Sequence, residues 1–400
     1  MEMGTDAIYQ DERQEPWRSL QRRVAPMLGE SLENALERRL KQTLEALERY
    51  LIASIHNEER AAKFLNLLPT VRMRCNEDIY DLPMAAEAYA YTHLANRYVR
   101  WWKVLHSLFE SGWLPMRRVG IDAMDIGSGP APATYALIDF MASISDAVAT
   151  IPCDKKAQQL RTDAPRITLS EKSREMARLV HHLSEHRPLH GPYGVELPDF
   201  FELRLARTRA SNAELREILI QGIMNAWEDV GYDEARAILM NDDPNWHQPK
   251  RFHLSMVSYL LTTETASGLA RPAFKDLRRT LPPGGTIVIM GGMDDNYARI
   301  HARVKQQMSG LHHLQVTKPF TVSFDDPLQV LLKPFYARIA QHARSLTSDI
   351  EDVDAPWRTD TYLRNLWDPD RKVPSATFAV EIFRAPDDRG ARQHRRARRH

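Results

Sequence analysis

The sequence predicts an α/β fold in which a mostly parallel sheet, with helices on both faces, follows an N-terminal helical region. From about residue 118, short apolar runs alternate with amphipathic helical patterns, which is typical of parallel strands joined by crossover helices. Before that point, apolar residues recur every three or four positions, as they do along helices. Two strand-like runs near the end, 313–324 and 376–385, are expected to pair antiparallel at one edge of the sheet.

The helical region covers residues 1–115 and contains two long amphipathic helices. A leucine stripe marks the first helix, and an aromatic and aliphatic face marks a second one that starts after Pro83 and ends near Gly112 and Pro115. An aromatic stripe of this kind is more typical of core packing than of a lid over a ligand. A homodimer formed through this second helix is also an open hypothesis. The leucine stripe of the first helix consists of Leu32, Leu36, Leu40, Leu44, Leu47 and Leu51. The aromatic stripe of the second helix consists of Tyr91, Tyr98, Trp101 and Trp102.

The second region, residues 116–386, carries the alternating pattern. We expect strands within 119–127, 166–171, 251–261 and 284–292, and helices within 133–142, 172–186, 271–281 and 294–308. Two stretches, about 191–250 and 326–374, are rich in charge and mostly helical in pattern, so we interpret them as insertions. The tail 387–400 is rich in arginine and is expected to be disordered.

Composition excludes several classes of protein. The formal net charge is +1, so the whole molecule has no bulk attraction to polyanions, although the last twelve residues hold six arginines and no acid. The two cysteines, Cys75 and Cys153, form no CxxC pair, which argues against thiolate metal centres and favours free thiols. The polar, acidic start does not resemble a signal peptide, and no apolar run reaches the ~18 residues of a membrane span. We therefore expect a cytoplasmic protein without membrane contact.

Three histidines, His182, His186 and His190, are spaced by four residues, as zinc ligands on a helix can be. Pro188 is expected to end the helix before the third histidine. Histidines near a helix C-terminus also interact favourably with the helix dipole. The sequence therefore predicts no metal site.

The segment 121–140, IDAMDIGSGPAPATYALIDF, is the most informative part of the chain. A strand that ends in Gly-Ser-Gly and leads into a helix places free backbone amides at the carboxyl edge of a parallel sheet, where ligands bind. The dinucleotide pattern G-x-G-x-x-G fails because Pro132 stands at its third glycine, and no Gly-Lys-Ser/Thr follows for a phosphate loop. Asp125 would repel phosphates but suits a cationic ligand.

The run MDIGSGPAPATYAL resembles the first motif, D-x-G-x-G-x-G, of class I S-adenosylmethionine-dependent methyltransferases. Asp125, Gly127 and Gly129 match this motif, and Ala131 replaces its third glycine. The resemblance implies a Rossmann-like, mostly parallel seven-stranded sheet with an antiparallel C-terminal edge pair, and S-adenosylmethionine as the cofactor. It also implies that Ser128, within the motif, lies at the cofactor.

Later motifs follow in the family's order. Glu171 in ITLSEKS resembles the acid that binds the ribose hydroxyls, although it follows Gly129 by 42 residues where about 20 is usual. Ser258 and Tyr259 in FHLSMVSYLL resemble the strand end beside the methyl group, and His253 stands where the family often has an acid. LPPGGTIVIM resembles the turn into the fifth strand.

The resemblance implies transfer of a methyl group to an O or N nucleophile, most simply that of a small molecule. Two alternatives stay open: an RNA or protein acceptor guided by the basic tail, and a non-catalytic scaffold that keeps the fold. A C-terminal cysteine cluster, frequent in relatives of ribosomal small-subunit methyltransferases, is absent, and so are Asn-Pro-Pro-Tyr-like motifs of DNA base methylation. Candidate general bases are His253, Tyr259 and an acid of 191–250.

Overall fold

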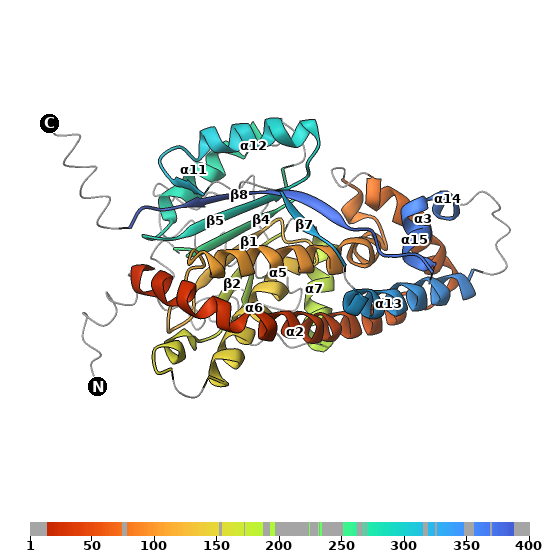
Figure 1. The fold of residues 1–400 in the computed structure, drawn as a ribbon. Helices are drawn as coiled ribbons and strands as arrows, with labels where there is room; N and C mark the ends of the chain where they lie inside the picture. The colour runs from red at the N-terminus through yellow and green to blue at the C-terminus, as the bar shows by residue number, and fades with distance from the viewer. Residues whose placement is uncertain are drawn as a thin grey trace.

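The fold was analysed in a computed structural model of the whole chain. The structure describes residues 14–73, 78–151, 154–171, 173–186, 193–196, 224, 231, 233, 251–261, 267–268, 270–314, 319–324, 326–347, 356–368 and 370–387. A single mixed sheet forms its centre, with helices on both faces and a group of helices beyond one end (Figure 1).

The sheet has eight strands, and its main path runs β3-β2-β1-β4-β5-β8-β6. The first five strands along this path are parallel, whereas β8 runs antiparallel to β5 and to β6. A short β7 pairs with the beginning of β8. The strands are β1 (Asp122–Ile126), β2 (Arg166–Ser170), β3 (Tyr193–Glu196), β4 (Leu254–Ser258), β5 (Thr286–Gly291), β6 (His312–Leu314), β7 (Phe320–Val322) and β8 (Ala376–Arg384).

The predicted parallel strands and the antiparallel edge pair are confirmed, and one part of the insertion prediction is wrong. Residues 193–196, placed at the start of the insertion 191–250, form the edge strand β3 and pair in parallel with β2. Four residues, preceded by Gly191-Pro192 and followed by Leu197-Pro198, are too short to show a strand period, which is why the pattern concealed this strand. Apart from three isolated residues, the rest of 197–250 lies outside the described residues, and so do the tail 388–400, His190 and both cysteines.

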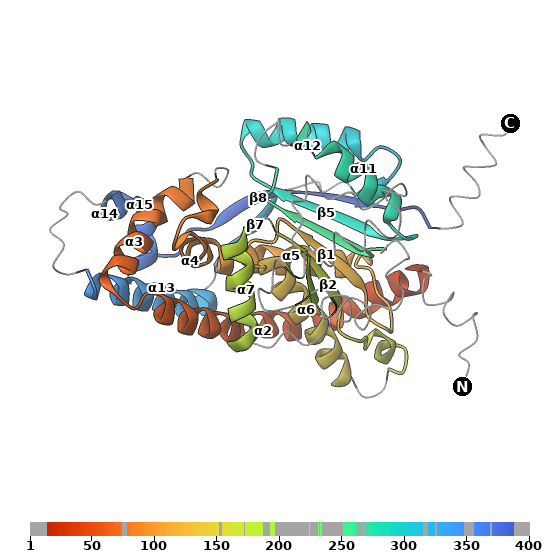
Figure 2. The ribbon, with the colours of Figure 1, turned by 180° about the vertical axis from the view of Figure 1, so that it is seen from behind.

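Crossover helices cover the two faces of the sheet (Figure 2). Helices α6 (Pro132–Ala149) and α7 (Arg174–His186) lie on one face, whereas α11 (Arg271–Thr280) and α12 (Asp295–Gln307) lie on the other. Strand β5 shows why both faces are apolar: Ile287 and Ile289 enter the core below α11 and α12, and Val288 and Met290 enter the opposite core. A strand that is buried on both faces reads as a continuous apolar run.

The N-terminal helices are α2 (Gln14–Ser54), α3 (Glu58–Met73) and a long helical segment, 85–110. All six leucines of the predicted stripe are buried on α2, which packs against α5 and α6. The segment 85–110 consists of α4 (Ala85–Tyr89), a π-helical turn at Ala90–Leu94 and α5 (Ala95–Glu110). Single π turns inside α-helices are rare and often occur at functional sites.

The stretch 326–374 forms α13 (Asp326–Ser345), α14 (Pro356–Thr359) and α15 (Thr361–Trp367), in agreement with its helical pattern. These helices pack on the N-terminal region, because α13 contacts α2 and α3, and α14 contacts α3. Arg338 of α13 makes a bidentate ion pair with Glu48 of α2, with N–O distances of 2.5 and 2.6 Å. Chain segments almost 300 residues apart therefore build one helical layer at the end of the sheet (Figure 1).

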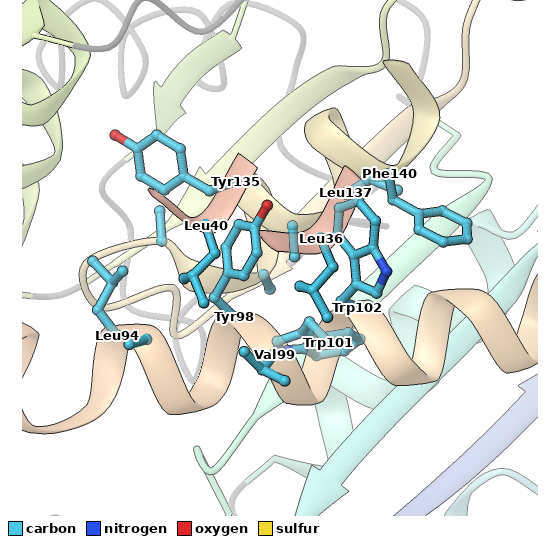
Figure 3. Packing of buried hydrophobic residues seen from close by; sticks show 14 of the residues in the cluster. Leu36, Leu40, Leu94, Tyr98, Val99, Trp101, Trp102, Tyr135, Leu137 and Phe140 are labelled. Atoms are coloured by element: carbon cyan, nitrogen blue, oxygen red, sulfur yellow. The ribbon is translucent and has the colours of Figure 1, made fainter. Parts of the chain in front are cut away.

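The aromatic stripe lies in the core (Figure 3). Tyr98 donates a 2.6 Å hydrogen bond to Asp139 of α6, and Trp102 packs edge-on against Phe140 at 5.2 Å between ring centres. All four stripe residues are at most 2% exposed. This face of the helix is covered by other helices of the same chain. Among the described residues, no helix is long and apolar enough to cross a bilayer.

Tyr91 joins the N-terminal helices to α13 and α15, so its replacement tests the packing of these helices into one layer. Its buried hydroxyl donates to the carbonyl oxygen of Tyr336 at 2.9 Å and accepts from the indole N–H of Trp367 at 2.8 Å. Tyr91→Phe would remove the partner of the Trp367 N–H and one donor to the Tyr336 carbonyl oxygen, and we expect it to lower the free energy of unfolding by about 1–3 kcal/mol in urea titrations. Val330→Ala, at an exposed position of α13, is the control and should stay within about 0.5 kcal/mol of the parent. An unchanged stability of Tyr91→Phe would contradict this role.

Candidate functional site

The carboxyl ends of β1, β2 and β4 meet at one edge of the sheet. Ile126, the last residue of β1, pairs with Ser170 of β2 on one side and with Val257 of β4 on the other. The next residues, Gly127, Glu171 and Ser258, therefore come level with one another. The strand order reverses between β1 and β4, and doubly wound sheets bind ligands outside such a switch point. All seven residues that the sequence predicts as cofactor contacts lie at or next to this edge, namely Asp125, Gly127, Ser128, Gly129, Glu171, Ser258 and Tyr259.

The loop after β1 is fixed by the end of β2. The amides of Gly127 and Ser128 both donate to the carbonyl oxygen of Ser170, at 2.8 and 3.2 Å. Gly127 and Gly129 have φ values of +63° and +54°, a region that glycine occupies without steric cost. A Cβ on Gly127 would also lie 2.9 Å from Leu260 Cδ1. The conformation thus favours glycine here, and a side chain would also require Leu260 to move.

Ala131 takes the place of the third glycine and adopts the same left-handed conformation, with φ at +58°. Helix α6 begins directly after it with Pro132, whose missing N–H costs nothing at that position. A small side chain therefore fits, as the motif comparison suggested, but an alanine in this region of φ and ψ is strained by about 1 kcal/mol.

Asp125 lies one residue before the end of β1 and is 1% exposed. Its Oδ2 accepts from the backbone N–H and the hydroxyl of Thr134, at 3.2 and 2.8 Å, in the first turn of α6. Burial raises the pKa of the Asp125 carboxyl to about 7, against the two hydrogen bonds from Thr134, and the charge of Glu171 adds to the rise. Oδ1 has no hydrogen-bond partner among the described residues. A cationic ligand at Oδ1 would stabilise the ionised form.

Glu171 follows β2 directly, and its carboxylate closes the same loop. Oε2 accepts from the amide of Gly129 at 2.6 Å, and Oε1 accepts from the amide of Ser173 at 2.9 Å. The unusual spacing of 42 residues therefore does not separate Glu171 from the motif, because α6 and a 3₁₀ turn at Ala157–Leu160 occupy the intervening chain. Each carboxylate oxygen has a second lone pair, so Glu171 can still accept hydrogen bonds from a ligand.

Two serines complete the polar lining. Ser128 in the loop and Ser258 at the end of β4 are 5% and 6% exposed, and neither hydroxyl has a partner in the part of the chain that the structure describes. Buried polar atoms are normally hydrogen-bonded, and a bound polar molecule is one common explanation where they are not. With Asp125 Oδ1, they form a set of unpaired buried groups at the ends of β1 and β4. This set fits a polar ligand that carries a positive charge.

Tyr259 follows β4 with a left-handed backbone, φ +55°, held by a 3.0 Å hydrogen bond from its amide to the carbonyl oxygen of Met290. This conformation directs the side chain to α5, where the hydroxyl accepts a hydrogen bond from Arg100. The guanidinium of Arg97 lies over the Tyr259 ring at 4.6 Å, and that of Arg100 at 5.3 Å. Tyr259 thus lies between the sheet edge and the helical layer.

Sequence reasoning missed Tyr89, Arg97 and Arg100. The Tyr89 ring lies 3.4 Å from the position of a Cβ on Gly129, and its hydroxyl accepts from Arg97. In a regular α-helix, two residues that are eight positions apart point in directions that differ by about 80° around the helix axis. A π turn adds one extra residue to the turn and so reduces the angle between the two directions to about 20°. The π turn at Ala90–Leu94 therefore brings Tyr89 and Arg97 to one face. Two arginines within an apolar helical face were the available signal.

Other sequence candidates lie elsewhere. His253 precedes β4 and is therefore at the opposite edge of the sheet, about 16 Å from Ser258 at the usual strand rise. There its Nδ1 lies 3.1 Å from the Asp122 amide, and its Nε2 lies 3.1 Å from Arg117. Burial, and then the charge of Arg117, lowers the pKa of His253 to about 4. His253 is thus not at the site as a base. Within the described residues, no cluster of possible metal ligands occurs.

The parallel order 3-2-1-4-5, followed by an antiparallel strand inserted next to β5, is decisive for the fold. This is the class I methyltransferase fold. No family model and no curated protein matches the chain. Solved structures with similar folds include the [4+2]-cyclase SpnF, with 12% identity, a TM-score of 0.35, and coverage of 72% of this chain and 80% of that chain.

The CurJ carbon methyltransferase has 11% identity and a TM-score of 0.30, over 93% of this chain and 99% of that chain. A phosphoethanolamine N-methyltransferase of Haemonchus contortus, solved with S-adenosylhomocysteine, has 12% identity and a TM-score of 0.33, over 80% and 66% of the two chains. At these values the assignment of the fold depends on the strand order and the glycine loop of this chain, not on the neighbours.

The strained backbone at residue 131 leads to a prediction about stability. We expect Ala131→Gly to raise the free energy of unfolding by up to about 1 kcal/mol, because glycine relieves the left-handed strain and loses part of that gain to chain entropy. Ala131→Val should lower it, since a β-branched residue at positive φ is strained further. Thermal unfolding of both variants shows whether stability rises in Ala131→Gly and falls in Ala131→Val. A loss of stability in Ala131→Gly would contradict the conformation described here.

The buried carboxyl of Asp125 leads to a prediction about pH. Its pKa is raised in the folded state, so the folded protein holds this proton more tightly than the unfolded chain, and stability falls as pH rises from about 4 to about 7. Asp125→Asn keeps an acceptor for Thr134 and removes this titration. Between pH 5 and pH 8, the stability of the variant relative to the parent should rise by on the order of 3 kcal/mol in urea titrations without ligand. A pH-independent difference would contradict the burial of a titrating carboxyl at this position.

Proposed function

We propose that this protein is an S-adenosylmethionine-dependent methyltransferase that acts on an O or N nucleophile of a small molecule. One observation carries the proposal: a fully buried carboxyl group with a free oxygen stands at the switch point of the sheet, next to a glycine loop that a second carboxylate holds. The proposed cofactor contacts are Asp125, Gly127, Ser128, Gly129, Glu171, Ser258 and Tyr259.

The chemistry of these groups fits that cofactor. When bound, S-adenosylmethionine supplies an electrophilic methyl group on a sulfonium sulfur. Asp125 offers a negative charge in a desolvated position, which favours the positively charged groups of such a ligand. The Glu171 carboxylate is of the type that binds ribose hydroxyls in the resembled motif, and the bare backbone at Gly127 and Gly129 permits close approach. Asp125 and Glu171 thus take the roles that the motif resemblance implies.

The contribution of the protein to methyl transfer is mainly positioning. Holding donor and acceptor in line can supply up to ~7–11 kcal/mol of the barrier reduction in well-oriented systems. Of the candidate bases, His253 lies at the opposite edge of the sheet, whereas Tyr259 lies at the carboxyl edge with a hydroxyl that already accepts from Arg100. We assign it to the orientation of the acceptor. We assign acceptor binding to the helical layer, since its helix 85–110 brings Tyr89, Arg97 and Arg100 to the site.

A small-molecule acceptor is favoured over RNA because the positive charge at this site is enclosed. Arg97 is 7% exposed and is covered by two tyrosine rings, whereas nucleic-acid surfaces present arginines to solvent along a groove. The remaining support for an RNA or protein acceptor is the arginine tail, 389–400. Removal of this tail, followed by a salt titration of RNA binding, separates the hypotheses.

Binding of S-adenosylhomocysteine, measured by calorimetry, is the first test of the proposed function. The parent should bind it, and Gly127→Val should reduce the affinity at least tenfold, because the added side chain strains the loop and meets Leu260. Val330→Ala, far from the sheet edge on α13, is the matched control and should bind as the parent does. No heat with the parent protein would favour a scaffold that has lost the cofactor.

The acceptor class follows from labelled methyl transfer. Purified protein and radiolabelled S-adenosylmethionine are incubated with metabolite, RNA and protein fractions of a cell extract, with Gly127→Val as the inactive reference. We expect label in the metabolite fraction. Label in RNA that is lost when the tail 389–400 is removed would establish the alternative instead.

A further inference from the structure

The strongest feature that the proposed function leaves unexplained is a pair of arginines on α5. Arg97 and Arg100 are one helical turn apart, and both guanidinium groups lie against the ring of Tyr259. Arg97 donates to the hydroxyl of Tyr89 and also lies over that ring at 4.9 Å. Arg100 donates to the hydroxyl of Tyr259 and lies 5.3 Å from the ring of Phe378.

Neither arginine has an acidic partner among the described residues. Each guanidinium donates to a phenol hydroxyl. The Nε of Arg100 is buried and has no hydrogen-bond partner among the described residues. Burial, and then the charge of Arg97, lowers the pKa of the Arg100 guanidinium to about 10. The pKa of His93 is likewise well below its usual range, because of burial first and the charge of Arg97 next. The charges of the described residues around this pair are therefore positive.

Two other arginines with limited exposure do pair with acids. Arg72, on the neighbouring α3, pairs with Asp360 at 2.7 Å, and Arg384, which is 2% exposed, pairs with Asp387 at 3.1 Å. Two adjacent buried charges of one sign are costly unless an opposite charge joins them. Bare arginine pairs of this kind are suited to carboxylate and phosphate, which the planar guanidinium binds through two parallel hydrogen bonds.

The position of the pair indicates which molecule brings that charge. The acids that act on the proposed cofactor, Asp125 and Glu171, stand at the ends of β1 and β2. The side chains of both arginines extend from α5 to Tyr259, which follows the end of β4. Arg100 also lies against Phe378 of β8. Tyr362 of α15 and Tyr297 of α12 are close enough to interact electrostatically with Arg100. The enclosure is therefore built from the helical layer and the far half of the sheet.

We propose that Arg97 and Arg100 bind an anionic group, a carboxylate or a phosphate, of the methyl acceptor. This rests on the proposed function, since it places the group beside a bound methyl donor. Tyr89 and Tyr259 hold the two guanidinium groups apart and in place while the site is empty. The anion neutralises the pair and directs the rest of the acceptor to the end of β4.

The same chemistry could come from the amino-acid carboxylate of the cofactor itself, and the test separates the two sources. Inorganic phosphate and acetate are the probes, titrated by calorimetry and by thermal unfolding in a chloride buffer of constant ionic strength, with and without saturating S-adenosylhomocysteine. We expect phosphate to bind the parent in both conditions. We expect at least a tenfold weaker affinity for phosphate in Arg100→Met and in Arg97→Met.

Two further variants complete the design. Arg100→Lys keeps the charge but loses the planar fork, so its affinity for phosphate should be intermediate. Arg358→Met removes an exposed arginine that also stacks on an aromatic ring, at 4.9 Å from Trp357, and should bind phosphate as the parent does. Because the pair is repulsive when empty, Arg100→Met without phosphate should unfold at the same temperature as the parent or a higher one.

The outcomes distinguish failure of this proposal from failure of the proposed function. Competition between phosphate and S-adenosylhomocysteine, with both weakened in Arg100→Met, would assign the pair to the cofactor carboxylate and overturn the proposal. Absence of phosphate and acetate binding in a parent protein that binds S-adenosylhomocysteine would overturn it as well, and would leave the methyltransferase assignment intact. Phosphate binding that persists in both arginine variants would place the anion elsewhere.

Discussion

The attachment of the loop after β1 to the end of β2 is the constraint on which the site depends. The Ser170 carbonyl oxygen accepts from two successive loop amides, and the Glu171 carboxylate accepts from the next glycine amide and from the start of α7. These bonds fix a left-handed backbone at Gly127, where a side chain would be strained and would displace Leu260. The turn in turn sets where α6 begins, and α6 supplies Thr134 to the buried Asp125. A local backbone requirement thus determines the electrostatics of the whole edge.

The second half of the site comes from outside the sheet. The helix 85–110 is buried between the sheet and the rest of the helical layer, with Tyr98 and Trp102 packed on α6 and Tyr91 packed on α13 and α15. Because this packing anchors the helix on both sides, its π turn has a defined orientation and delivers Tyr89 and Arg97 to the same place. The late insertion therefore supports the site indirectly, by holding the helix that reaches it.

Much of this could be predicted from the sequence, for identifiable reasons. Strand β5 is an apolar run next to glycines, whereas β1 and β4 mix apolar residues with aspartate or serine, and the motif around Asp125 places glycine at two positions with positive φ. Glu171 could be proposed from the sequence in spite of its long spacing, because it directly follows a strand-like run. By contrast, β3 is too short to show a period, and a π turn has no sequence signature. The packing of 326–374 on the N-terminal helices is a contact between distant segments that no local pattern encodes. The prediction that His253 is a base at the site is wrong because His253 lies at the amino end of β4, whereas the site lies at the carboxyl end of that strand.

The charges at the site are segregated rather than paired, and this separation is itself informative. Glu171 is the charged neighbour that acts on Asp125, and Arg97 is the one that acts on Arg100. Opposite charges would stabilise the protein most if they met, yet each has its own contacts: Thr134 donates to the acid, and two tyrosines contact the arginines. Such an arrangement is costly when empty and is relieved when a cation and an anion enter side by side. A positively charged methyl donor and a negatively charged acceptor would meet this condition together, with Tyr259 at the boundary between them.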